Sequence, residues 1–362
     1  MTPALRAILG AGARRVRRWR GRDAPVEGLP DGLARETVEE VCRRQLGAGL
    51  ERVAYEHLSG WKSTGSYRVW LHSARGHRAS VVYRNALYGV DQIPALARLP
   101  VKPGPAEYVV YTTAAADLRG YLPDAYLVKE VVPGRHYQYV LEDLGSEYDD
   151  VRMEAAPDVA EALGDIRRAM QEWLSRIDPG RLLRYDHRFS EDLQVYVFES
   201  LTRYVNTASN ETVAELLRRW DAIAAVHRDR AFHAERPLEP IHGDFNRSNI
   251  LMHRHRKERL KIIDWEWCGL GTAHADIASL LKNATPEVER RVMAIAAAAD
   301  PRLTPEEHGR LYAWCRLERG LLDAAFLAVQ ELSDGARSMR GHIDAAARRA
   351  LGAYRELSDR HV

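Results

Sequence analysis

Residues 242–267 read HGDFNRSNILMHRHRKERLKIIDWEW, and this stretch decides the fold and the chemistry that the sequence predicts. Its two apolar runs, Ile250 to Met252 and Leu260 to Ile263, lie on either side of the polar connector HRHRKER. Short apolar runs around a polar connector are typical of a β-hairpin. A hairpin returns the chain to its starting point, so the residues just before the first strand and just after the second should meet.

Three polar side chains should converge at that mouth. Asp244 precedes Asn249 by five residues, and Asp264 follows the second apolar run. Mg²⁺ takes a few oxygen ligands from a protein and keeps positions for water and phosphate, so an Asn amide oxygen and an Asp carboxylate suit it. The other Asp could accept a hydroxyl proton, as in protein kinases. Each motif alone could be a turn or a solvated strand end, but in this order they favour phosphoryl transfer.

The segments HGDFNRSN (242–249) and IDWE (263–266) resemble the two signature motifs of the aminoglycoside phosphotransferase and choline kinase superfamily. The resemblance covers about residues 50–330. It implies that Asp244 is the catalytic base and that Asn249 and Asp264 bind the metal ion. It also implies Mg²⁺ as cofactor and a nucleoside triphosphate as phosphoryl donor.

The residues around these motifs receive supporting roles from the same resemblance. His242 and Asp276 would support the catalytic loop, with Asp276 accepting hydrogen bonds from the loop backbone. A carboxylate in the first turn of a helix can equally be a simple helix-terminus charge, so that alternative stays open for Asp276. Glu266 would lie on the acceptor side of the site.

The nucleotide should be covered by a loop upstream of these motifs. Ser59 to Ser66 connects two predicted strands and contains the small residues Ser63, Thr64 and Gly65. Small residues let backbone amides approach phosphate oxygens closely. An ordinary β-turn explains the same composition, so both interpretations stay open.

Four further residues are predicted to contact the nucleotide. Arg84 ends a strand where the superfamily presents a basic residue to the phosphates, and Arg can hold phosphate oxygens with two parallel hydrogen bonds. Glu107 on the following helix is its expected partner, although both could be unconnected surface residues. Glu142 and Leu144, in the segment LEDLG, resemble the hinge between kinase lobes, where backbone groups bond the purine edge.

The sequence predicts an α+β, protein-kinase-like fold with two lobes. Residues 1–33 form a basic N-terminal extension and linker, residues 34–144 a nucleotide-binding N-lobe, and residues 145–362 a mostly helical C-lobe with the catalytic loop and acceptor site. Apolar residues recur at helical spacing after residue 145, for example over 157–177. One helix is expected over Thr212 to Phe232.

Composition narrows the class of protein. The 362 residues carry 53 basic and 51 acidic side chains, a net charge of +2, which gives no general attraction to nucleic acid. The three cysteines fit neither a disulfide framework nor a zinc pattern, and a reducing cytoplasm is expected.

No apolar run is long enough to span a membrane. In residues 1–23 the apolar residues Leu5, Ile8 and Leu9 come before the arginine cluster that begins at Arg14. A signal peptide has the opposite order, so a solvated extension is expected, with a membrane-surface helix as the alternative.

These observations predict phosphorylation of a small-molecule hydroxyl by ATP or GTP. Polycationic acceptors need an acidic cleft, and this chain is slightly basic, so we expect a neutral or singly charged sugar, cyclitol, nucleoside or antibiotic natural product. An aminoglycoside resistance phosphotransferase is the alternative within the class. A nucleotide-binding regulatory pseudokinase is the alternative outside it, although a binder has no need of Asp244. No nucleic-acid partner and no stable membrane insertion are expected.

Overall fold

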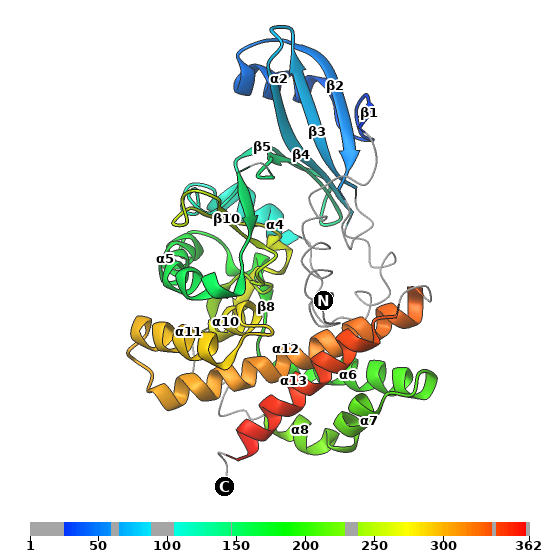
Figure 1. The fold of residues 1–362 in the computed structure, drawn as a ribbon, viewed down its shortest axis with the longest axis vertical. Helices are drawn as coiled ribbons and strands as arrows, with labels where there is room; N and C mark the ends of the chain where they lie inside the picture. The colour runs from blue at the N-terminus through cyan, green and yellow to red at the C-terminus, as the bar shows by residue number, and fades with distance from the viewer. Residues whose placement is uncertain are drawn as a thin grey trace, which may run out of the picture. The chain divides into compact units, whose positions relative to one another are not determined.

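The structure is a computed structural model that describes residues 25–58, 65–87, 105–145, 147–228, 238–334 and 338–359. These residues form two compact units, one containing residues up to 87 with 122–149, the other 105–121 with 150–359 (Figure 1). Residues 105–121, which the predicted N-lobe includes, cluster with the second unit, and the lobe boundaries stay a prediction. The basic N-terminal residues and the loop residues Ser63 and Thr64 lie outside the described residues.

The first unit is built on a six-stranded antiparallel sheet in the order β1-β2-β3-β4-β6-β5. Alternate residues of the central strands point to one face, so that Val69, Leu71, Val81 and Tyr83 form a core almost without solvent exposure. The strands are β1 (Val26–Glu27), β2 (Leu50–His57), β3 (Ser66–Ser73), β4 (Arg78–Leu87), β5 (Ala125–Val132) and β6 (His136–Glu142).

Helix α2 (Arg35–Leu46) covers this core. Its apolar stripe buries Val38, Val41 and Cys42 against the sheet. The helix ends at Gly47, which has a φ of 61° and donates its N–H to the Arg43 carbonyl at 3.0 Å. Glycine adopts this left-handed conformation without steric cost, so the helix end follows directly from the sequence.

A buried ion-pair network fixes the end of β6. Arg68 on β3 is 8% exposed and donates to Asp143 at 2.6 Å and to Glu56 at 2.8 Å. Asp143 also accepts hydrogen bonds from the Ser80 hydroxyl at 2.7 Å and from the Gly145 N–H at 3.0 Å. These contacts hold the backbone directly after β6, where the sequence predicts the hinge.

The second unit contains the predicted hairpin. Strand β10 (Ile250–His253) pairs antiparallel with β11 (Leu260–Ile262), with Ile250 opposite Ile262. A second small sheet has the order β8-β12-β9, formed by β8 (Leu183–Arg184), β12 (Gly269–Gly271) and β9 (Glu239–Ile241). The catalytic loop predicted from the sequence therefore runs from the end of β9 to the start of β10.

Helices make up most of the rest of the second unit. They are α4 (Pro105–Val109), the π-helix η2 (Val110–Ala114), the 3₁₀ turns η3 (Met153–Ala155), η4 (Pro179–Arg181) and η5 (Trp265–Trp267), α5 (Ala156–Leu174), α6 (His187–Thr207), α7 (Glu211–Arg218), α8 (Trp220–His227), α10 (His274–Leu280), α11 (Pro286–Ala299), α12 (Pro305–Asp334) and α13 (Arg340–Ser358). Along the chain, the division between the two units falls within strand β7 (Tyr148–Asp150). The α+β fold class is confirmed.

The prediction of a single helix over Thr212 to Phe232 is wrong for the described residues up to 228, and residues 229–232 of that prediction lie outside the described residues. The chain leaves the helical conformation at Arg219, with φ −99° and ψ 8°, and forms α7 and α8 instead. The break lets each short helix turn its own apolar face inward: α7 packs on α13, and α8 packs on α6, α12 and α13. Helix propensity alone cannot show such a break, because tertiary packing overrides it.

Helices α12 and α13 run side by side in close contact (Figure 1). Gly320 on α12 faces Ala350 on α13 so closely that an added Cβ would lie 2.9 Å from the Ala350 nitrogen. The neighbouring Ala324, Ala328 and Ala347 are fully buried. This tight seam fixes the position of α12, whose side chains reach the catalytic loop. Among the helices of the described part of the chain, none has the length and apolar character needed to cross a membrane.

Candidate active site

The catalytic loop makes a tight turn at Gly243. This residue has a φ of 79°, and an added Cβ would lie 2.2 Å from the Trp267 carbonyl oxygen and 2.9 Å from the Tyr185 hydroxyl. The Tyr185 hydroxyl itself donates to the Trp267 carbonyl at 2.7 Å. Only glycine fits both the conformation and the space, which explains the glycine of HGD in physical terms.

Asp276 fixes the backbone of the catalytic loop through two hydrogen bonds. Its carboxylate, on α10, accepts the N–H of His242 at 2.9 Å and that of Gly243 at 3.0 Å. Burial raises the pKa of Asp276, and the neighbouring His242, the two backbone hydrogen bonds and Arg167 act in the opposite direction. This is the geometry that the loop-supporting role requires, in place of a solvated helix-terminus charge.

We expect Asp276→Asn to destabilise the loop. An Asn side chain can accept one of the two N–H groups, but its own amide nitrogen then faces the other donor. A buried donor left without a partner costs about 1–3 kcal/mol, so the free energy of unfolding should fall by that amount and turnover should fall with it. Urea denaturation measures the change in stability, and an ATP turnover assay measures the change in activity.

The matched control is Asp300→Asn, which removes an ion pair with Arg302 at the protein surface. It should change the free energy of unfolding by less than about 1 kcal/mol. Equal losses in the two variants would contradict the supporting role of Asp276.

His242 joins the loop to the hairpin. Its Nε2 donates to the Ile263 carbonyl at 3.1 Å, and its Nδ1 accepts the Asp244 N–H at 3.3 Å, which places the ring proton on Nε2. The ring packs against Trp265, with 4.6 Å between ring centroids, and is 1% exposed. The histidine therefore fixes the spacing between Asp244 and the residues that follow β11.

Asp244 and Asn249 are in direct contact. The Asn249 amide nitrogen donates to the Asp244 carboxylate at 2.9 Å and to its backbone carbonyl at 3.0 Å. Because the nitrogen of the amide is used in this way, its oxygen is the atom that could bind a cation. Asn249 is buried, whereas the Asp244 side chain retains 18% exposure. The amide can thus serve a metal ion while the carboxylate stays accessible.

Asp264 lies at the same end of the hairpin. The Ile263 N–H donates to the Asn249 carbonyl at 2.9 Å. Asn249 therefore lies just before β10 and Asp264 just after β11, at the same end of the hairpin. Asp264 adopts the left-handed conformation, with φ 67° and ψ 53°, which Asp tolerates better than most residues. One carboxylate and one amide oxygen form the kind of donor set that a hard cation such as Mg²⁺ binds.

The predicted nucleotide residues lie on separate elements. Arg84 is on β4 of the first unit, whereas Glu107 is buried on α4 of the second, and their pairing stays a prediction. Gly65 packs against the Tyr67 ring, where an added Cβ would lie 2.3 Å from the ring. Glu142 ends β6, and Leu144 is buried two residues later.

Glu266, predicted on the acceptor side, is fully buried in η5. The short helix α4 packs against this turn. The contact of Glu266 with an acceptor therefore stays a prediction.

Sequence reasoning missed Arg319, which contacts the predicted base. From α12, the Arg319 Nη2 donates to the Asp244 Oδ1 at 2.6 Å. The two residues are 75 positions apart, and no local pattern links them. The nearest signal is the i,i+4 spacing of Arg319 and Asp323, which is also common on solvated helices.

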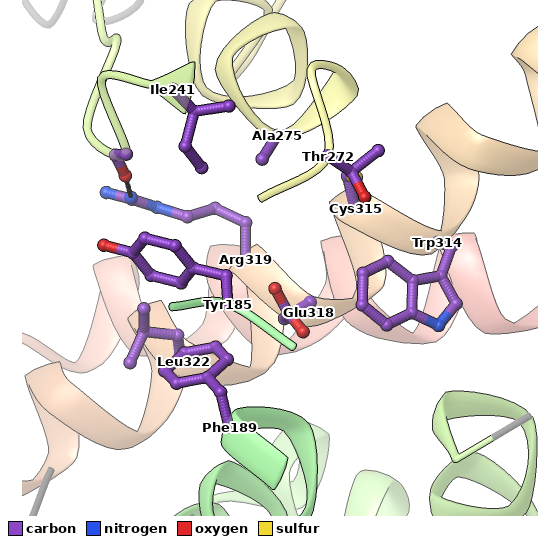
Figure 2. A pocket seen from close by; sticks show the side chains of 11 residues that line it. Tyr185, Phe189, Ile241, Thr272, Ala275, Trp314, Cys315, Glu318, Arg319 and Leu322 are labelled. Atoms are coloured by element: carbon purple, nitrogen blue, oxygen red, sulfur yellow. Dashed lines mark hydrogen bonds between the residues drawn. The ribbon is translucent and has the colours of Figure 1, made fainter. Parts of the chain in front are cut away.

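A small cavity lies between α12 and the catalytic loop (Figure 2). It encloses about 40 Å³, and the Arg319 side chain crosses it next to the Tyr185 ring. Its walls are mostly apolar, and they are formed by Tyr185, Phe189, Ile241, Gly243, Thr272, Ala275, Trp314, Cys315, Glu318, Arg319 and Leu322. Such a space can hold water.

Comparison with solved structures identifies the fold. A choline/ethanolamine kinase family protein from Mesorhizobium loti is 17% identical, with 89% of this chain and 96% of that chain covered and a TM-score of 0.53. A choline kinase from Cryptosporidium parvum Iowa II is 12% identical (91% and 97% covered, TM-score 0.60). A spectinomycin phosphotransferase in complex with ADP and spectinomycin is 9% identical (89% and 99% covered, TM-score 0.54). At these identities the similarity shows the fold, and it confirms the predicted kinase-like fold class.

Sequence comparison identifies the family. No curated protein matches the chain. The model of the phosphotransferase enzyme family matches residues 91–314, which include both the HGDFNRSN and the IDWE segments. The predicted superfamily is confirmed, and the chain belongs to the phosphotransferase enzyme family.

Proposed function

We propose that the protein transfers the γ-phosphoryl group of ATP or GTP to a hydroxyl group of a small molecule, assisted by Mg²⁺. The observation that carries the proposal is the contact between Asp244 and Asn249 at the end of the hairpin that also presents Asp264. In this arrangement the Asp244 carboxylate can accept a proton, and the side-chain oxygens of Asn249 and Asp264 can bind a cation. Phosphoryl transfer requires both, and positioning and charge neutralisation account for most of its catalysis.

The reaction can be written with Asp244 as the general base. The acceptor oxygen forms a bond to the γ-phosphorus, and its proton passes to the Asp244 carboxylate. The bond from the γ-phosphorus to its bridging oxygen breaks, and the nucleoside diphosphate leaves. Asn249 and Asp264 would hold Mg²⁺, which when bound neutralises charge on the phosphate oxygens.

The proposed donor site comprises the nucleotide-binding residues predicted from the sequence. Gly65 and Arg84, with Ser63 and Thr64, would contact the phosphates, and Glu107 would orient Arg84. The backbone at Glu142 and Leu144 would bind the base. Support comes from the Arg68–Asp143 network, which fixes the chain immediately after β6. The choice between ATP and GTP depends on that backbone, and a titration with each nucleotide decides it.

The ion pairs next to Asp244 support an acceptor that is not a polycation. Arg319 pairs with both Asp244 and Asp323, and Lys282 and Arg349 also pair with Asp323. Cations of the protein therefore already neutralise these two carboxylates. A polycationic ligand needs an acidic cleft, whereas a neutral or singly charged hydroxyl compound does not.

We expect a panel of hydroxyl compounds to show this preference. The panel would contain sugars, cyclitols, nucleosides, choline, ethanolamine, aminopropanol, spectinomycin and polycationic aminoglycosides, with ATP consumption measured at low and high salt. A neutral or singly charged compound should give the highest kcat/KM, with little dependence on salt. Preference for aminoglycosides that disappears as salt rises would instead identify a resistance enzyme, since salt screens such attraction. Nucleotide binding without turnover for any alcohol would favour a regulatory module.

A further inference from the structure

The Asp244 carboxylate is held on both of its oxygens. Oδ2 accepts the side-chain amides of Asn246 at 3.0 Å and Asn249 at 2.9 Å. Oδ1 accepts Arg319 Nη2 at 2.6 Å, and Arg319 Nη1 also donates to the Gly243 carbonyl at 3.3 Å. Two amides alone would let the carboxylate plane rotate about its own bond. The third contact, on the opposite oxygen, fixes that plane.

Arg319 is itself held by a second set of charges. Its Nε donates to the Asp323 Oδ1, one helical turn further along α12, at 3.1 Å. The other oxygen of Asp323 accepts Lys282 Nζ at 2.5 Å and Arg349 Nη2 at 3.1 Å. Asp244, Asp323 and Arg319 have side-chain exposures of 18%, 11% and 24%, so water screens these contacts only in part.

The effects on pKa agree with this geometry. Burial acts to raise the pKa of Asp323, but Arg319, Lys282 and Arg349 outweigh it and hold that pKa at about 2. Burial likewise acts to lower the pKa of Arg319, and the carboxylates of Asp323 and Asp244 outweigh it and raise that pKa. Asp323 is therefore ionised and Arg319 protonated at neutral pH, so the ion pair between them persists.

We propose that Arg319 is a positioning residue that orients the Asp244 carboxylate toward the acceptor hydroxyl, and that Asp323, Lys282 and Arg349 hold Arg319 in place. The proposal rests on the proposed function, in which Asp244 is the base. The fork of Arg319 bridges Asp244 and the Gly243 carbonyl, so the arginine fixes the loop backbone and the carboxylate together. A lysine, with one ammonium group on a flexible stem, cannot reproduce that fork.

The test compares Arg319→Met with Arg319→Lys. The substrates are MgATP with water as acceptor and MgATP with the best acceptor of the hydroxyl panel. In Arg319→Met we expect kcat to fall by about tenfold to hundredfold, the size of effect that a small misplacement of a catalytic group produces. The KM for MgATP should stay within about twofold because Arg319 donates to the proposed base Asp244, to the Gly243 carbonyl and to Asp323, and not to a residue proposed to bind the nucleotide. Arg319→Lys should lie between the parent and the Met variant.

Rescue separates positioning from a structural role. Millimolar guanidinium ion should restore part of the kcat of Arg319→Met and should not change the parent. The matched control is Arg316→Met, which lies one turn away on α12, has 21% side-chain exposure and pairs with Glu289 and Glu356. It should keep the parent kcat and show no response to guanidinium. Amide hydrogen exchange over residues 242–249 should be faster in Arg319→Met than in Arg316→Met.

The possible results distinguish a wrong positioning role for Arg319 from a wrong proposed function. Suppose that Asp244→Asn is inactive but Arg319→Met keeps the parent kcat. The positioning role is then wrong and the proposed function stands. If Arg319→Met does not fold, Arg319→Lys takes its place in this comparison. If kcat falls equally in Arg319→Met and Arg316→Met without guanidinium rescue, the ion pair only stabilises α12, and the inference is also wrong. If Asp244→Asn itself keeps its turnover, the proposed function is wrong, whatever the Arg319 variants show.

Discussion

Asp244→Asn should lower kcat by about 10²–10⁴-fold, the usual contribution of a general base, while the Kd for nucleotide stays near that of the parent. The variant removes the group that takes the acceptor proton, but it leaves Asn249 and Asp264 as ligands for the cation. Transient kinetics with the best panel acceptor gives kcat, and calorimetric titration with MgADP gives the Kd. These two measurements together separate loss of chemistry from loss of binding.

The amide nitrogen of an Asn at position 244 would face a hydrogen-bond donor on either side. Both oxygens of Asp244 accept hydrogen bonds from donors, so the amide nitrogen of an Asn must face Arg319 on one side or Asn246 and Asn249 on the other. Asp244→Ala removes that conflict and should be equally inactive. Asp165→Asn, at an exposed ion pair on α5, is the control and should retain full activity. Near-parental turnover in both Asp244 variants would exclude Asp244 as the base.

The central part of the site could be predicted because its information is local. Apolar runs on either side of a polar connector predicted the hairpin, and a hairpin necessarily brings Asn249 close to Asp264. The structure contains that pairing, with Ile250 opposite Ile262. Asp276 could be proposed only with the help of the family resemblance, because its two hydrogen bonds reach back more than thirty residues to the loop.

Other features could not be predicted because packing decides them. Arg319 and Asp323 show the i,i+4 spacing of an ordinary solvated ion pair, and only the position of α12 against α13 turns them toward Asp244. That position depends on small residues such as Gly320 facing Ala350. The break between α7 and α8 at Arg219 has the same origin, since each short helix follows its own burial requirement.

A second large effect is expected at Asp264. Its carboxylate would be the only charged protein ligand among the proposed metal-binding residues, so its loss should remove most of the Mg²⁺ dependence of nucleotide binding as well as turnover. Replacing even a residue that only supports a metal ligand weakens metal affinity by about 10–100-fold, and a direct ligand should matter at least as much. Titration of ATP with and without Mg²⁺ measures the effect directly.

The choice of substitution at Asp264 matters because its backbone is left-handed, with a φ of 67°. Alanine disfavours this conformation by about 1–2 kcal/mol, so Asp264→Ala alone would mix a backbone effect with the loss of a ligand. Asp264→Asn keeps a residue that tolerates the conformation and removes only the charge. Both variants should lose the Mg²⁺-dependent gain in nucleotide affinity, and Asp244→Asn should retain it. If Asp264→Asn shows the Mg²⁺ dependence of the parent, then Asp264 is a residue at a strand end whose conformation, and not its charge, the hairpin requires.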